Sequence, residues 1–116
     1  MRPFYHADKK DISLAGVLYA LGDPVRLEIV KRLAVKGELT CAALGCESDA
    51  GSISKSIAKS TMSHHFRILR ESGVIYCRKA GTQHINSLRR EDLETLFPGL
   101  LDAVLQASGI LVPSGI

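Results

Sequence analysis

The spacing of apolar residues predicts helices in the first third of the chain. Between residues 11 and 21 they recur at three- and four-residue intervals, on one side of an amphipathic helix. A second helix is predicted over residues 24–36, because Asp23 can cap its free N–H groups and the proline after it fits the first helical position. A short third helix is predicted over residues 39–44, with Thr40 as its N-cap.

A Gly- and Ser-rich stretch separates these helices from the next one. It covers residues 45–60 and predicts a loop. The helix that follows can be capped by Ser60 or Thr61, and its apolar residues fall on one face at i, i+4 and i+7. That face carries Met62, Phe66 and Leu69.

β-Branched and aromatic residues after Gly73 predict a hairpin. Residues 74–77 and 83–88 suit two strands joined by a turn. A helical pattern resumes over residues 89–108, where Pro98 kinks or restarts the helix. The order helix-helix-helix-helix-hairpin-helix makes the fold mainly α with a small β-hairpin, of the α+β class. A helix-turn-helix followed by a hairpin "wing" is a known route into DNA.

The chain is short enough for a single domain. Its 116 residues divide into a flexible N-terminal segment over residues 1–10, a winged helix-turn-helix domain over residues 11–108 and a C-terminal tail over residues 109–116. No stretch approaches the roughly 18–20 apolar residues that span a bilayer, and the N-terminus lacks the apolar centre of a signal peptide. We therefore expect a cytoplasmic protein without a membrane partner.

Basic charge is concentrated in one segment. The net charge of the whole chain is only +3, but residues 53–90 hold eight basic side chains and one acidic side chain, a net +7. The remaining residues carry seven basic and eleven acidic side chains, a net −4. The basic segment coincides with the predicted fourth helix and the wing, so it favours a double-stranded DNA partner.

Other function classes fit less well. The chain has no phosphate-binding glycine loop, no nucleophile elbow and no histidine–carboxylate constellation, so we expect no enzyme activity. A winged-helix module that binds protein is the alternative, but such a module has no need of the basic segment. A regulator without any effector also remains open.

Two motifs carry a family resemblance. The stretch STMSHHFRILRESGVI, residues 60–75, closely resembles the recognition-helix signature of ArsR-type bacterial regulators. The stretch LGDPVRLEIV, residues 21–30, resembles the second-helix signature of the same family. The resemblance covers residues 12–105. It implies a winged helix-turn-helix homodimer that represses or otherwise controls transcription at a palindromic operator, with a dimer interface made by the first and last helices.

The residues expected to contact DNA lie on the fourth helix and the wing. Hydroxyls near a helix N-terminus can bond phosphates or base edges, and arginine can bond guanine or phosphate. For Ser60 and Thr61 simple capping is the competing interpretation, and for His65 it is a hydrogen-bonded histidine inside the domain that can also touch phosphate. Arg26, in the second-helix motif, is expected to brace the domain through an ion pair. The candidate DNA contacts are Lys59, Ser60, Thr61, Ser63, His64, His65, Arg67, Arg70, Arg78 and Lys79, with Arg78 and Lys79 expected at the wing tip.

Neither familiar metal motif of the family is present. The arsenic- and metal-responsive version has Cys-x-Cys in the third helix, but this chain has Thr40 and Ala42 at the two ligand positions and Cys41 out of register. The zinc version needs Asp and His pairs in the last helix, which here has no histidine. We therefore expect no resident cofactor, and a metal or metalloid effector stays open.

The three cysteines allow two interpretations. An odd number argues against a secreted disulfide framework. Cys41, Cys46 and Cys77 can form a thiol-based sensor of metal, metalloid or redox state, with Cys41 and Cys46 able to bridge if the loop brings them together. Alternatively, Cys41 and Cys77 are small core residues.

Overall fold

The N-terminal part of the structure is helical. The computed structural model describes residues 6–41, 43–44 and 59–109. Ser13 accepts a hydrogen bond from the N–H three residues on, and the Asp23 carboxylate accepts from two N–H groups of the following turn, so each of the first two α-helices begins at a capping residue. Both predicted helices are confirmed, the first with a later start. The elements are a 3₁₀ turn η1 (Lys9–Asp11), α1 (Leu14–Leu21) and α2 (Pro24–Lys36).

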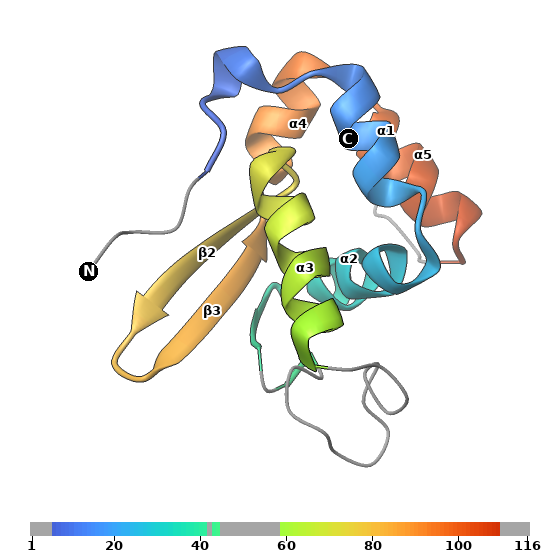
Figure 1. Cartoon of the computed structure of the whole chain (residues 1–116). Helices are drawn as coiled ribbons and strands as arrows, with labels where there is room; N and C mark the ends of the chain where they lie inside the picture. Colours follow the sequence, from blue (N-terminus) through green and yellow to red (C-terminus); the bar gives the residue numbers. More distant parts are fainter. Residues whose placement is uncertain (1–5, 42, 45–58, 110–116) are drawn as a thin grey trace.

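A small antiparallel sheet extends from the helical body beside the recognition-helix candidate α3 (Lys59–Glu71) (Figure 1). Its strands lie in the order β1-β3-β2, so β3 is central. Asn86 of β3 stands opposite Leu39 on one side and opposite Cys77 on the other. The predicted hairpin is confirmed and gains a third strand. The strands are β1 (Glu38–Thr40), β2 (Ile75–Ala80) and β3 (Gln83–Leu88).

The predicted third helix over residues 39–44 is wrong at its start. Its first residues belong to β1, because the exposed edge of β3 offers backbone partners that a short helix cannot match. The local signal at Thr40 still holds, since its Oγ1 accepts a hydrogen bond from the N–H of Ala43 at 3.1 Å. The N–H of Leu44 bonds the Thr40 carbonyl at 3.1 Å, which closes one turn after the strand.

The start of α3 also differs from the prediction. The helix already includes Lys59, so Ser60 and Thr61 lie in its first turn and neither is the N-cap. The predicted loop over residues 45–60 therefore ends earlier, and its residues 45–58 lie outside the described part of the chain.

The last predicted helix is two helices, α4 (Arg90–Leu96) and α5 (Leu100–Ala107). The break lies at Pro98, as predicted, because a proline inside a helix removes a hydrogen bond and clashes with the preceding turn. Leu93, Leu101 and Leu105 are buried, so both helices contribute to the core.

Residues before α1 pack against the wing and α3. The Cys77 N–H donates to His6 Nε2 at 2.9 Å, and Arg89 Nη1 donates to the Ala7 carbonyl at 2.7 Å. Ile12 is buried against Gly73, where φ is +89° and an added Cβ would clash with the Ile12 side chain. The folded part of the chain thus includes residues 6–10, which the sequence assigned to a flexible segment. Residues 1–5 and 110–116 lie outside the described part.

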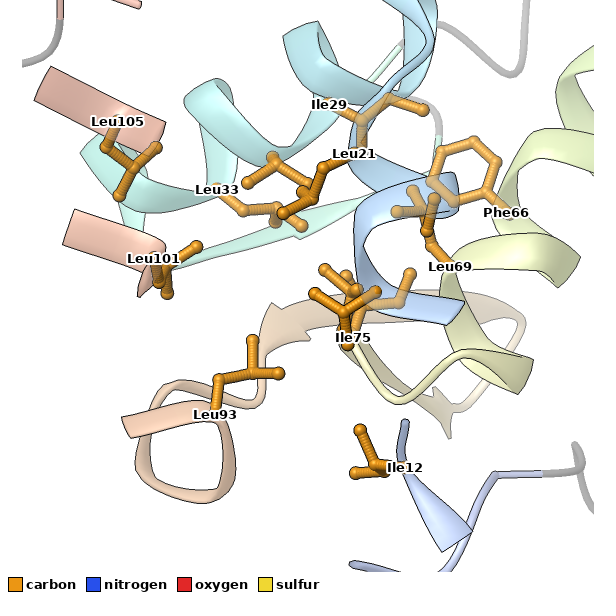
Figure 2. Packing of buried hydrophobic residues seen from close by; sticks show 14 of the residues in the cluster. Ile12, Leu21, Ile29, Leu33, Phe66, Leu69, Ile75, Leu93, Leu101 and Leu105 are labelled. Carbon is orange, nitrogen blue, oxygen red and sulfur yellow. The ribbon is translucent and has the colours of Figure 1, made fainter. Parts of the chain in front are cut away.

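One hydrophobic core joins the helices to the base of the sheet. Figure 2 shows side chains from α1, α2, α3, α5 and β2 converging on it. The predicted apolar face of α3 is confirmed, since Met62, Phe66 and Leu69 are all buried. Because this apolar face packs into the core, the opposite side of α3 points to solvent.

Candidate nucleic-acid interface

The outer face of α3 is polar and exposed. Ser63, His64 and Arg67 all face solvent on the side away from the core. Arg67 Nη2 and His64 Nδ1 are 3.2 Å apart. This contact holds the Arg67 guanidinium beside the His64 ring on the exposed face of α3. Ser60 and Thr61 are exposed in the first turn of the helix, and the side chain of Lys59 lies outside the described part. This face offers hydroxyl, imidazole and guanidinium groups of the kind that contact bases and phosphates.

The wing presents its cations differently from the prediction. The turn of the hairpin is formed by Gly81 and Thr82, so Arg78 and Lys79 lie within β2 and not at the tip. Arg78 Nη2 is 3.2 Å from Glu38 Oε1, and both side chains are more than half exposed. Because side chains alternate between the faces of a strand, Lys79 is on the same face as Cys77 and Arg78 is on the other. Glu38 was not foreseen, since only the pairing of β1 with β3 brings it to the wing.

Two other basic residues of the segment are already paired. Arg89 is buried, with Nη2 2.9 Å from Asp92 Oδ2 and its guanidinium 4.5 Å from the centre of the Tyr76 ring. Arg90 Nη1 is 3.2 Å from Asp102 Oδ1. The net +7 counted along the sequence therefore overstates the charge available to a partner. Arg70, in the last turn of α3, is half-buried.

A buried network holds α3 against the first two helices. Arg26 is buried and donates from Nε to the Ala20 carbonyl at 2.8 Å and from Nη2 to the Tyr19 carbonyl at 3.1 Å. Its Nη1 is 3.1 Å from His65 Nδ1. The predicted bracing role of Arg26 thus works through hydrogen bonds to carbonyls and imidazole.

His65 belongs to this network more than to the outer face. The residue is 9% exposed and its Nδ1 is 3.8 Å from Asp23 Oδ2. Burial lowers the pKa of His65 below its ordinary value, with Arg26 and His64 acting in the same direction and Asp23 opposing them. A neutral ring can accept the hydrogen bond from Arg26, so His65 positions the recognition-helix candidate.

We expect this histidine to make stability depend on pH. The folded protein resists protonation of His65, whereas the unfolded chain binds the proton at the ordinary pKa of about 6.5. The contribution of His65 to the free energy of unfolding is therefore largest above about pH 6.5, and it decreases as the pH drops below that value. Urea unfolding at pH 7.5 and pH 5.0 measures the change. The substitution His65→Gln should flatten it, whereas His64→Gln on the exposed face should leave most of it. An equal slope in wild type and His65→Gln would contradict this assignment.

The cysteines occupy two different environments. Cys41 is half-buried directly after β1, and Cys77 is buried in β2. Burial raises the pKa of the Cys77 thiol to about 11, and the neighbouring Cys41 adds to the rise. Within residues 6–41, 43–44 and 59–109 no three histidine, cysteine or acidic side chains come together as a metal site. Cys46 lies outside these residues.

Comparison with known proteins decides the family. A helix-turn-helix domain model matches residues 21–78, half of the chain. YceK, an HTH-type transcriptional regulator of Bacillus subtilis, is 36% identical over 91 residues, which cover 78% of this chain and 84% of that protein. The crystal structure of an ArsR family transcriptional regulator aligns with a TM-score of 0.57 at 23% identity, covering 83% of this chain and 91% of that one. The chain belongs to the ArsR-type helix-turn-helix transcriptional regulators.

A second solved structure extends the comparison of this ArsR-type regulator. The transcriptional repressor BigR from Xylella fastidiosa aligns with a TM-score of 0.51 at 28% identity, covering 72% of this chain and 85% of that one. The family and the fold are those of DNA-binding transcriptional regulators, not of enzymes. In the described part of the chain no helix combines the length and apolar character needed to cross a membrane.

Proposed function

We propose that this ArsR-type regulator represses transcription by binding a palindromic operator as a homodimer, with α3 of each protomer in the major groove. The observation that carries the proposal is the division of α3 into a buried apolar face and an exposed polar face. The buried face fixes the orientation of the helix, and the exposed face presents Ser63, His64 and Arg67 together. In helix-turn-helix proteins the recognition helix contacts base edges with its N-terminal residues.

The remaining candidate contacts flank this face. Ser60 and Thr61 lie at the end of the helix that would enter the groove, where hydroxyls suit phosphate oxygens. Lys79 and Arg78 are exposed on the wing, where cations suit the phosphate backbone. His65 is better suited to holding α3 in place, because it is buried, whereas Arg70 is half-buried on the same helix stripe as Ser63 and Arg67.

Exposed apolar residues on α1 support the dimer. Leu14 and Leu18 are each about half exposed at i, i+4 spacing, and Tyr19 beside them is 66% exposed. Such a stripe is what a partner helix covers in a stable dimer. We propose α1 and α5 as the dimer-forming helices. The repressor role is proposed by similarity to BigR, and a regulator of this kind would act in the cytoplasm, where bacterial DNA lies.

Binding to the regulator's own promoter tests the proposal. We expect two protomers per duplex and a clear preference over a duplex of scrambled sequence. Arg67→Ala should weaken specific binding by about 1–3 kcal/mol if the guanidinium contacts a base. Lys10→Ala removes the same charge from η1, which lies at the far end of the molecule from the first turn of α3 (Figure 1), and serves as the control. Equal binding of both duplexes would instead favour a protein-interaction module.

A further inference from the structure

We propose that the cavity between α3 and the sheet binds a small phosphate monoester, and that this ligand displaces DNA by occupying the same side chains. Only the displacement of DNA rests on the proposed function, because the cavity itself is a feature of the fold. Its volume is about 390 Å³, within the range of about 300–1,000 Å³ that holds small organic ligands. One wall is formed by α3 and the other by the sheet with the turn after β1.

One stripe of α3 supplies hydrogen-bond donors to the cavity. Ser60, Ser63, Arg67 and Arg70 follow one another at intervals of three and four residues, so their side chains lie along the same side of the helix. A guanidinium presents a planar fork of N–H donors that fits two phosphate oxygens at once, and each serine adds a hydroxyl. The stripe therefore combines neutral donors with two permanent positive charges, which is the chemistry that recognises an oxyanion.

Arg67 can turn its charge to a ligand. Within the described part of the chain it has no carboxylate partner, whereas Arg78, Arg89 and Arg90 each lie within 3.2 Å of one. Its contact with His64 leaves donors on both residues. Arginine can only donate, so His64 Nδ1 accepts and the ring hydrogen is on Nε2. Among the described residues no acidic side chain lines the cavity, so nothing there repels an anion.

The sheet adds an imidazole to the opposite wall. His84 of β3 lines the cavity and stands opposite Lys79 in the β2–β3 ladder. The side chains of such a pair lie on one face of the sheet, about 4.5–5.5 Å apart at Cβ. The exposed Lys79 therefore adds a positive charge beside His84 on the face that carries the cavity. An anion held here is flanked by basic groups from both α3 and the hairpin.

The deeper part of the cavity is apolar. Phe66 and Cys77 are buried and Cys41 is half-buried, and all three line it. A bare phosphate ion leaves this surface uncovered, whereas a monoester can place a small apolar group on it, and removing apolar surface from water stabilises the complex. A phosphodiester of the DNA backbone has a sugar on each side and stays at the mouth. The cavity thus favours a small monoester over a DNA phosphate.

The ligand and DNA need the same side chains. Ser60, Ser63, His64 and Arg67 are exposed at the cavity and are also proposed DNA contacts. One protomer therefore cannot hold both at once. For this kind of competition, a ligand at ten times its Kd lowers the affinity of each protomer for the operator by roughly tenfold.

Titration calorimetry of the full-length protein with phenyl phosphate, in the absence of DNA, tests the site. We expect wild type to bind phenyl phosphate more tightly than inorganic phosphate. Arg70→Gln should weaken binding roughly ten- to hundredfold, as expected for the loss of a charge-assisted hydrogen bond. His84→Gln, on the other wall, should weaken it as well. Arg32→Gln removes the same charge from α2, where Arg32 pairs with Glu28, and should bind as wild type does.

Three calorimetric results would contradict the site. Wild type that does not bind phenyl phosphate would overturn the proposal. The same conclusion would follow if Arg70→Gln and His84→Gln bound as tightly as Arg32→Gln. Inorganic phosphate that binds as tightly as phenyl phosphate would restrict the cavity to the bare ion and overturn the monoester.

Operator affinity in the presence of phenyl phosphate tests the displacement. Phenyl phosphate should release wild type from its operator more effectively than sodium chloride at the same ionic strength. His84→Gln should need more phenyl phosphate for the same fractional release, with each protein compared with its own operator affinity. Bound phenyl phosphate that leaves operator affinity unchanged would overturn the displacement.

Two further outcomes separate the cavity from the proposed function. If His84→Gln and Arg70→Gln weakened operator binding but wild type did not bind phenyl phosphate, the cavity would hold a DNA phosphate and the monoester site would be wrong. If the protein failed to bind its promoter, the proposed function would fail, while calorimetry without DNA would still decide whether the cavity binds the monoester.

Discussion

Replacing Phe66 by alanine should lower the free energy of unfolding by about 3–5 kcal/mol. The Phe66 side chain is 3% exposed and belongs to the core that joins α3 to the other helices (Figure 2). Removing the ring leaves a cavity that the surrounding side chains fill only in part. Urea unfolding at pH 7.5 measures the loss.

The neighbouring exposed face supplies the control for Phe66→Ala. Ser63→Ala changes an exposed residue of the same helix, so we expect its stability to stay within about 0.5 kcal/mol of wild type. If both variants unfolded at the same urea concentration as wild type, the inward face of α3 would be assigned wrongly. The assignment of the DNA-facing side of α3 would then be wrong as well.

Operator affinity should fall steeply with salt. Four cations of each protomer are proposed to contact phosphate or bases, so a dimer makes about eight such contacts. They are Lys59, Arg67, Arg78 and Lys79. Each phosphate contact releases counterions, so the slope of log affinity against log salt is roughly −7, and affinity drops roughly 10⁴-fold between 50 and 200 mM salt. The Glu38 carboxylate beside Arg78 reduces the contribution of that residue.

A salt titration by fluorescence anisotropy checks this expectation. A scrambled duplex should show a similar slope at lower affinity, because phosphate contacts carry no sequence information. Lys79→Ala should make the slope shallower, by roughly one contact per protomer. A change in operator affinity of less than tenfold over this range of salt would contradict a phosphate-contacting helix and wing.

The helical periodicity was sufficient to predict the face of α3. Met62, Phe66 and Leu69 repeat at intervals that any α-helix brings to one side, so their burial follows from local geometry. The caps at Asp23 and the break at Pro98 are equally local. The same reasoning failed over residues 39–44, because a stretch this short takes its conformation from the strand edge beside it.

The sequence alone predicted only in part which basic side chains are exposed and able to contact DNA. It placed Arg67 on the outer face correctly, but it counted Arg89 as part of the basic surface. Nothing near Arg89 in the predicted wing signals burial, although Asp92 three residues later is a suitable partner. Burial of an arginine depends on carbonyls such as that of Ala7, which reaches it from the other end of the chain.

By itself the sequence determined the winged helix-turn-helix order, the inward face of α3 and the ArsR-type family, because each depends on spacings of a few residues or on a contiguous motif. The tertiary structure decided that Glu38–Thr40 is a strand, that His65 joins Arg26 in a buried network, and that Cys41 and Cys77 share a cavity. These features depend on contacts between segments far apart in the chain. Such contacts form only when the core and the β1–β3 pairing are in place, so no local pattern encodes them.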